Sequence, residues 1–265
     1  MSEEKITLGV FGGSGFYSLF TEAEERVIET PYGAPSSKVV IGTIAEKKVA
    51  FMPRHGADHQ YPPHLINYRA NIWAMKSLGV ERLISPISSG SLVKEAAPGD
   101  FVICDQYVDR TSGRKDTFYD GPIVTHVSAA EPYCPQLREL AVQASIACKI
   151  KTHAKGTVVV IQGPRYSTQS ESKWFSSQGW TVVNMTQYPE AHLARELCIC
   201  VLNISLVTDY DTGLIEQVEP VSHAQVVAVF NSNLNKLKNM LAHLIKNIPA
   251  ERKCSCQNVL SQARG

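Results

Sequence analysis

Several features that mark specialised classes of protein are missing from this sequence. No run of apolar residues in its 265 residues approaches the roughly 18 that a membrane-spanning helix needs. The 26 lysines and arginines are balanced by 25 acidic residues and form no basic stripe. Nucleic-acid affinity depends on clustered positive charge that neutralises phosphates. The sequence therefore argues against a membrane or nucleic-acid partner.

The sequence also lacks internal repeats and linker-like stretches. We therefore expect residues 1–265 to form a single domain, with a C-terminal tail beginning at about residue 250. The first ten residues, MSEEKITLGV, are acidic and lead straight into a predicted strand, unlike a signal or transit peptide. This predicts a cytoplasmic protein. A hydrophobic fraction of 44% and a charged fraction of 19% are ordinary for a soluble globular chain.

A complete dinucleotide-binding fingerprint is missing too. The predicted strand 6–11 is followed by Gly12-Gly13-Ser14-Gly15, but the G-x-G-x-x-G pattern needs a glycine where Ser18 stands. Two interpretations remain open for this turn. Its backbone N–H groups and the Ser14 hydroxyl could bind a phosphate or another anion. Alternatively, the glycines serve only a tight turn with positive φ.

The seven cysteines divide into two kinds. Cys104, Cys148 and Cys198 have apolar neighbours and are most simply small core residues. Cys254 and Cys256 form a C-x-C pair in a polar tail, where burial explains little. The pair could be a disulfide, a redox group or half of a metal site. Because no histidine or second cysteine pair stands nearby in the sequence, zinc is the least favoured and a disulfide or exchange-prone pair the most favoured.

What the sequence does contain is an alternation of predicted strands and helices. Predicted strands cover residues 6–11, 39–44, 48–52, 83–87, 102–108, 157–161, 182–183 and 200–207, and predicted helices cover 67–78, 135–150, 169–179, 190–197 and 221–248. The pair 39–44 and 48–52 forms a predicted hairpin, which makes the sheet mixed. The pattern indicates an α/β fold.

The stretch 182–211 is central to the predicted fold. Its pattern predicts a strand, a turn, a helix and a second strand. The second strand is almost entirely apolar, as expected when both of its faces are covered. Thr208-Asp209-Tyr210-Asp211 comes at its carboxyl end, the edge at which open α/β sheets bind ligands. Asp209 and Asp211 are therefore candidate functional acids, although Asp-x-Asp also occurs as turn chemistry or a helix cap.

Polar groups follow other predicted strands as well. Arg54 offers a fork of N–H donors for an anion, with His55 beside it. Ser88 lies in a turn of small residues, and Thr186 follows the strand 182–183. Anion donors, an apolar floor and acids suit a sugar that lies between a phosphate and a nitrogen heterocycle. An acid beside a purine can protonate or hydrogen-bond N7 and accept from an exocyclic amine, which helps the base to leave.

Six motifs spread over essentially the whole chain resemble one family. They are GGSGFY, PRHG with PPH.INYRANIWA, SSGSL, PGDFV..DQ..DRT, GPRYST.SES, and NMT..PE with VTDYD. Together they are similar to the trimeric purine nucleoside phosphorylases, and most similar to the 5′-methylthioadenosine phosphorylase branch.

The resemblance implies a single-domain purine nucleoside phosphorylase-like fold, a mixed sheet with a distorted barrel surrounded by helices. It implies a homotrimer or a dimer of trimers, with active sites near subunit boundaries. The implied reaction is phosphorolysis: inorganic phosphate, a co-substrate, attacks C1′ of the nucleoside through an oxocarbenium-like transition state and releases the purine. Neither a metal nor an organic cofactor is implied.

The resemblance also implies roles for individual residues. It places Ser14, Arg54, His55, Ser88 and Thr186 at the phosphate, and Asp209 and Asp211 at N7 and the 6-amino group. The residues that it places around the nucleoside are Tyr166, Ser167, Asn184, Met185, His126 and His223. An ionised aspartate accepts from an amine and repels a 6-oxo group, so the D-Y-D pattern favours adenine over hypoxanthine. His126 is similar to a residue that relatives contribute to the neighbouring subunit's 5′ pocket.

Two positions depart from the branch pattern. Ile87-Ser88 stands where methylthioadenosine enzymes usually have Ser or Thr followed by Ala, which displaces the hydroxyl by one residue. His223 stands where that branch has a small or apolar residue and where purine nucleoside phosphorylases proper have a histidine that binds the ribose 5′-OH. This keeps adenosine or broad-specificity purine nucleoside phosphorolysis as the alternative. A surface histidine that points away from the site is the plainer interpretation.

The resemblance extends to the cysteines. The C-terminal CSC resembles a feature of archaeal members of the branch, where such pairs are linked to disulfides. Cys134 and Cys200 stand where relatives can also have cysteines, which implies that they pair.

Three other functions compete with the phosphorylase hypothesis. A hydrolase would leave the anion-type turns without a ligand. A dehydrogenase is disfavoured by Ser18. A purine sensor without catalysis would bind the ligand without turnover.

Overall fold

The computed structural model describes residues 6–13, 20–212, 214, 221–261 and 263 of the chain. The strands are β1 Leu8–Gly12, β2 Thr21–Arg26, β3 Val39–Ile44, β4 Lys47–Pro53, β5 Arg82–Ser91, β6 Phe101–Val102, β7 Gln106–Arg110, β8 Thr152–His153, β9 Thr157–Ile161, β10 Val182–Asn184 and β11 Cys200–Tyr210. The helices are α1 Tyr68–Ser77, α2 Pro135–Ala147, α3 Gln169–Ser177, α4 Gln187–Glu196 and α5 His223–Asn247, with short 3₁₀ helices at Pro63–Leu65 (η2) and Ser255–Asn258 (η3).

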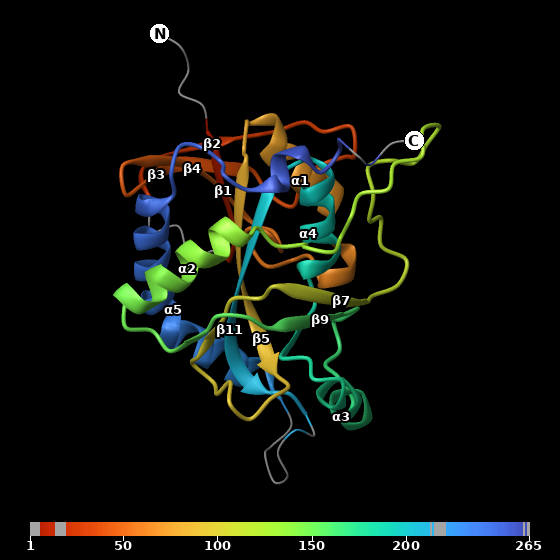
Figure 1. The fold of residues 1–265 in the computed structure, drawn as a ribbon, viewed down its shortest axis with the longest axis vertical. Coiled ribbons are helices and arrows are strands. Elements are labelled where there is room, and N and C mark those ends of the chain that lie inside the picture. The colour runs from red at the N-terminus through yellow and green to blue at the C-terminus, as the bar shows by residue number, and fades with distance from the viewer. Residues whose placement is uncertain (1–5, 14–19, 213, 215–220, 262, 264–265) are drawn as a thin grey trace.

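A mixed sheet forms the centre of the molecule, as predicted. Its main path is β2-β3-β4-β1-β5-β10-β9-β7, and it branches at β5, which also pairs with β11. β5 and β11 are the longest strands and run in parallel side by side through the middle of the molecule (Figure 1). Their register extends from Arg82 opposite Cys200 to Ser91 opposite Tyr210, with a bulge between Val207 and Asp209.

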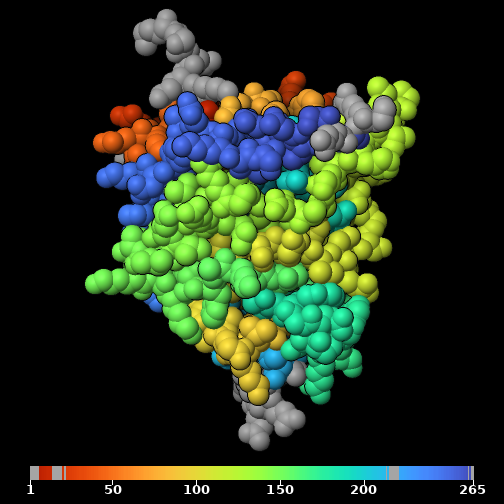
Figure 2. Space-filling model, viewed as in Figure 1, coloured from red at the N-terminus to blue at the C-terminus, as the bar shows by residue number. Residues whose placement is uncertain are grey.

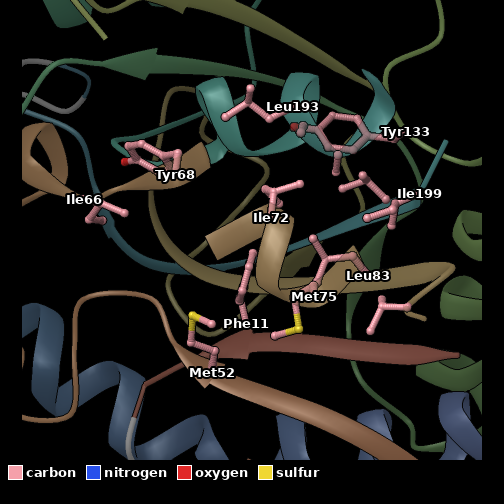
Figure 3. Packing of buried hydrophobic residues seen from close by; sticks show 14 of the residues in the cluster. Phe11, Met52, Ile66, Tyr68, Ile72, Met75, Leu83, Tyr133, Leu193 and Ile199 are labelled. Atoms are coloured by element: carbon pink, nitrogen blue, oxygen red, sulfur yellow. The ribbon is translucent and has the colours of Figure 1, made fainter. Parts of the chain in front are cut away.

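Helices cover both faces of the central strands, and each face has its own core. On one face α1 and α4 contribute Ile72, Met75 and Leu193 to a cluster that Figure 3 shows from close by. On the other face α2 and α5 contribute Leu137 and Leu241 to a second cluster. In Figure 1 these helix pairs lie on opposite sides of β5 and β11. The near-continuous apolar character of β11 follows from burial on both faces.

Local signals explain where the helices begin. The Asn67 side chain accepts a hydrogen bond from the Ala70 N–H at the start of α1. Thr168 and Glu171 form a capping box at α3, and the Ser222 hydroxyl caps α5. None of the helices in the described ranges combines the length and apolar character that crossing a bilayer requires.

Most predicted elements are confirmed, and three details are corrected. The predicted strand 102–108 is two short strands, because β6 pairs with β11 and β8 whereas β7 pairs with β9. β11 continues to Tyr210, so Asp209 lies within the strand instead of after it. Strand β2 was not predicted, because its sequence TEAEER carries no apolar alternation; it pairs with β3 alone among the described strands.

Candidate active site

A cavity of about 760 Å³ lies where the carboxyl ends of several strands meet the first turns of α5. Its walls come from the residues that end or follow β1, β4, β5, β9, β10 and β11, and from α5. This is the edge at which α/β sheets bind ligands. The sequence-predicted site residues that line it are Arg54, His55, Ser88, Tyr166, Ser167, Asn184, Met185, Thr186, Asp209, Asp211 and His223.

One predicted site residue falls outside the described residues, and another lies away from this wall. Ser14 lies outside the described residues, next to Gly12 and Gly13, which do line the cavity. His126 is exposed on a loop and is absent from the cavity lining; its backbone N–H donates to the Ala263 carbonyl at 2.7 Å. The isolated chain thus places His126 away from its own cavity.

Arg54 is buried and held rigidly at one wall. Its Nε donates to Glu190 Oε2 at 2.5 Å and its Nη2 to Glu190 Oε1 at 3.0 Å, in a two-point ion pair. Nη2 also donates to Ser85 Oγ at 2.7 Å. Among the described residues Nη1 makes no hydrogen bond, and Arg54 lines the cavity. A guanidinium fixed on one side can present its remaining donors to an anion in a set direction.

The Arg54 network continues inward and is fully connected. Gln187 Nε2 donates to Ser85 Oγ at 2.7 Å and to Glu190 Oε1 at 3.2 Å, and Gln187 Oε1 accepts from the Tyr133 hydroxyl at 3.0 Å. Glu190 and Gln187 belong to α4, Ser85 to β5. The paired strand and helix ends therefore determine where Arg54 points.

His55 has a defined tautomer and a neutral ring. Its Nδ1 lies 2.9 Å from the Tyr61 carbonyl, so this nitrogen carries the proton and donates. Burial lowers the pKa of His55 to about 4, and the positive charges of Arg54 and His59 act in the same direction. The ring stacks on that of His59 with centroids 4.4 Å apart. Nε2 of a neutral His55 is an acceptor for a protonated phosphate oxygen.

Around the rest of the cavity, several buried polar atoms lack partners. The hydroxyls of Ser167 and Thr186, the Asn184 amide nitrogen and Asp211 Oδ2 make no hydrogen bond within the described part of the chain. Thr186 occupies the N-cap position of α4 without capping it. Buried polar groups in native proteins are normally paired. Four unpaired ones around one cavity indicate a polar ligand there.

Asp209 and Asp211 are both protected from solvent and hold protons more tightly than free carboxyl groups. Burial raises the pKa of Asp209, and the Thr208 hydroxyl, which donates to Oδ1 at 2.7 Å, opposes the shift. Burial raises the pKa of Asp211 to about 6; the nearby Ser172 and Ser167 hydroxyls lower it, and Asp209 adds to the rise. Near neutral pH the pair can therefore both release and accept a proton.

Gly90 makes room for these acids. A Cβ built on Gly90 would lie 3.0 Å from Asp209 Oδ2 and 3.4 Å from the Asp211 Cβ. A side chain at this position would therefore crowd both carboxylates. The requirement for a small residue here is local packing, because no positive φ is involved.

The remaining wall is apolar and includes one histidine. Tyr166 and Met185, the sequence neighbours of Ser167 and Asn184, line the cavity. So do Val226 and Phe230 of α5. His223 begins α5 and lines the cavity. Burial lowers the pKa of His59 most, and the nearby His223 lowers it further through its charge. His223 therefore does not point away from the site.

Four residues of the site were missed by sequence reasoning: Ser85, Gln187, Glu190 and His59. A buried arginine needs a counter-charge, so Arg54 itself was a signal that a carboxylate should be sought. Its partner is 136 positions away in the sequence, which one sequence cannot reveal. His59 carries no signal in the sequence, because its stacking on His55 depends on the loop conformation.

No group of metal ligands was found at this cavity among the described residues. The group of His, Cys, Asp or Glu that could hold a metal ion is Cys134, Cys200, Cys254 and Cys256, and none of these lines the cavity.

Comparison with known proteins places this geometry in a family. Residues 7–246 match the Phosphorylase superfamily. The chain is 52% identical over 262 residues to the S-methyl-5′-thioadenosine phosphorylase of Thermofilum pendens, covering 98% of this chain and 99% of that protein. It is 45% identical over 262 residues to the purine nucleoside phosphorylase of Streptomyces coelicolor, covering 95% and 93%. The methylthioadenosine phosphorylase from Schistosoma mansoni, solved with adenine, superposes with a TM-score of 0.92 at 34% identity, covering 98% and 99%.

Proposed function

Because this chain belongs to the Phosphorylase superfamily, we propose that it is a pentosyltransferase that cleaves 5′-methylthioadenosine with inorganic phosphate, giving adenine and 5-methylthioribose 1-phosphate. One observation supports this most directly. A single cavity joins a fixed arginine and a neutral histidine at one wall to a pair of buried acids at another. The first wall suits a phosphate and the second a purine.

We assign the phosphate to Arg54, His55 and Thr186, with Ser88 and Ser14 as further donors. Arg54 offers the donors that Glu190 does not occupy, and His55 Nε2 accepts from a protonated phosphate oxygen. The unpaired Thr186 hydroxyl lines the cavity immediately before α4 and can donate to a phosphate oxygen. These contacts orient one phosphate oxygen for attack on C1′.

The leaving purine is assigned to Asp209 and Asp211. As the phosphate oxygen bonds to C1′, the C1′–N9 bond breaks and its electron pair passes to the purine. A proton supplied by the acid pair to N7 neutralises that charge, and the ionised oxygens accept from the 6-amino group. Tyr166, Ser167, Asn184 and Met185 complete the nucleoside pocket. The reaction as proposed needs no metal or organic cofactor.

The 5′ end of the substrate faces α5 in this proposal. Val226 and Phe230 form an apolar surface for a methylthio group, while His223 beside them can bind a 5′-hydroxyl. This second feature supports the alternative, adenosine or broad-specificity purine nucleoside phosphorolysis. The two functions share the phosphate and purine walls and differ at His223.

A homotrimer, or a dimer of trimers, is part of the proposal. His126 is too far from its own cavity to line it, and its loop exposes Ile123 and Val124, which are 58% and 66% accessible. Exposed apolar residues beside a polar one are typical of an interface between subunits. We expect His126 to serve a neighbouring subunit, and we expect the enzyme to act in the cytoplasm.

Substrate preference is tested by kcat/KM at saturating phosphate for methylthioadenosine, adenosine and inosine, in the wild type and in His223→Val. We expect methylthioadenosine to be the best substrate. The substitution should lower adenosine turnover by about 10–200-fold and leave methylthioadenosine turnover nearly unchanged, since one pocket group contributes about 1–3 kcal/mol.

Three results would change the assignment. Adenosine preferred by the wild type and lost in His223→Val would establish the alternative. Rapid inosine turnover would contradict the roles of Asp209 and Asp211. Turnover that continues without phosphate would indicate a hydrolase.

A further inference from the structure

Four cysteines from three distant parts of the chain meet at one point far from the cavity lining. Cys134 precedes α2, Cys200 begins β11, and Cys254 and Cys256 lie at the start of η3. Their sulfur atoms all lie within 4.8 Å of one another, and all four groups are free thiols in the structure. Cys200 Sγ and Cys254 Sγ are 3.4 Å apart.

The fold brings these segments together through contacts that do not involve sulfur. The Cys134 N–H donates to the Val201 carbonyl at 2.8 Å, which fixes the start of α2 against β11. Arg252 donates to the Cys198 carbonyl at 2.9 Å, and the Lys253 N–H to Gln136 Oε1 at 3.2 Å. In Figure 2 the blue C-terminal segment runs along the upper edge of the light-green surface that includes α2. The convergence therefore belongs to the folded scaffold.

We propose that Cys134, Cys200, Cys254 and Cys256 bind one thiophilic divalent ion, Zn²⁺, as a closed structural site. Four thiolates at about 2.3 Å from zinc form a tetrahedron whose sulfur atoms are about 3.8 Å apart. The Cys200–Cys254 sulfur separation is 3.4 Å and the other pairs lie within 4.8 Å, so shifts of about 1 Å suffice. Each thiol that becomes a ligand releases its proton to the solvent.

The surroundings favour a closed site over a reactive one. Cys134, Cys200 and Cys256 are buried in the core between α2 and α5, and Cys254 packs against that core. Four sulfur ligands complete a tetrahedral shell without a position for water or substrate, which is typical of structural zinc.

The charge of a four-thiolate zinc site, a net −2, is partly offset by cations of the same region. Arg252 lies beside Cys198, although it also pairs with Glu81 at 3.5 Å, and Lys253 follows Arg252. Cys134 stands at the N-terminal end of α2, where the first backbone N–H groups favour negative charge.

The ion would attach the C-terminal tail to the core. Cys254 and Cys256 belong to the segment after α5, while Cys134 and Cys200 anchor the first turn of α2 and the start of β11. Sequence reasoning disfavoured zinc because no second cysteine pair stands near the C-x-C pair. The structure supplies that pair from residues 54 or more positions away.

Cobalt(II) is the probe for this proposal, because thiolate ligation produces intense charge-transfer bands and tetrahedral geometry produces strong visible bands. The full-length enzyme is purified anaerobically with a reductant, stripped of metal and titrated with Co²⁺ and then Zn²⁺. We expect about one equivalent of Co²⁺ per chain with both sets of bands, and displacement of Co²⁺ by Zn²⁺. Metal analysis of the enzyme purified without chelator should show about one zinc per chain.

Matched serine variants localise the site. Cys254→Ser and Cys256→Ser, both in the tail, should lose the cobalt spectrum, whereas Cys148→Ser, outside the cluster, should retain it. Zinc should raise the melting temperature of the wild type and of Cys148→Ser but not that of the tail variants.

The proposal is overturned if the reduced wild type takes up no Co²⁺, or takes up Co²⁺ without the thiolate bands. It is also overturned if the anaerobically purified enzyme is metal-free and four mass units lighter than its all-thiol form. That mass would show two disulfides in place of the metal site.

Discussion

The two walls of the cavity treat their buried polar groups differently. At the Arg54 wall every neighbour is engaged: Glu190, Ser85 and Gln187 bond to one another and to the guanidinium. At the Asp211 wall the buried polar atoms of Ser167, Asn184 and Asp211 have no partner among the described residues. The network that holds Arg54 in place is paired without a ligand, whereas the polar atoms of the second wall are not.

This difference separates two ways of building a site. A connected network fixes the position of a charged group and contributes to stability, because removing one member leaves another buried without a partner. Unpaired groups cost stability in the free protein and are compensated when a ligand binds. We therefore expect substitutions at the first wall to affect folding and function together, and those at the second to affect function while sparing or improving stability.

The largest effect is expected at the unpaired wall. Asp211→Asn keeps the shape of the side chain but cannot hold a proton for N7, so kcat/KM for methylthioadenosine should fall by about 10²–10⁴-fold. Steady-state phosphorolysis measures this, and Glu95→Gln, an exposed carboxylate outside the cavity, serves as the control. A loss of less than about threefold would remove Asp211 from the catalytic machinery.

The next effect is expected at the connected wall. Glu190→Gln leaves the buried Arg54 charge uncompensated, which should cost about 3–5 kcal/mol of unfolding free energy and raise the KM for phosphate. Urea denaturation and phosphate kinetics measure the two losses. Glu25→Gln, which breaks the exposed pair with Lys38, should cost no more than about 1 kcal/mol.

A double variant separates structure from function at this wall. Arg54→Met combined with Glu190→Leu removes both charges, so stability should recover while phosphate use should not. Recovery of activity together with stability would show that Arg54 has only a structural role.

The smallest effect is a pH dependence of stability. The pKa of Asp211, about 6 in the native protein, lies above the ordinary 3.8, so between these pH values the native protein binds more protons than the unfolded chain. The group destabilises the native protein least below pH 4, and stability falls as the pH rises through about 6, by about 3 kcal/mol at most.

Melting temperatures of Asp211→Asn and the wild type, compared at pH 4 and pH 8, measure this effect. The variant should gain stability relative to the wild type at pH 8 and not at pH 4. The same difference at both pH values would mean that the carboxylate is not destabilised by burial.

The sequence predicted which side chains line the cavity better than it predicted the hydrogen bonds and ion pairs that hold them. Periodicity predicts strands and helices because burial repeats along the chain, and strand ends predict which residues meet at an edge. Arg54, Asp209 and Asp211 were found in this way. The hairpin 39–44 with 48–52 was found from its apolar runs and is confirmed by β3 and β4.

What could not be predicted depends on contacts between distant segments. Glu190 meets Arg54, and Cys200 meets Cys254, only through the sheet and the path of the tail. A polar edge strand such as β2 has too little apolar patterning to be recognised. The roles given to individual site residues remain predictions until the variants are measured.

The bulge in β11 changes which face of the sheet its alternate side chains occupy. Before it, Val207 lies opposite Ser89 and faces the α1 and α4 core, and Leu206 faces the α5 side. Two residues later the register has slipped by one, so Asp209 lies opposite Gly90 and takes the α5 face instead of that of Val207. Without the extra residue, uninterrupted alternation would place the Asp209 side chain on the same face as Val207. One inserted residue thus lets a single strand pack into the core along most of its length and present an acid to the cavity at its end.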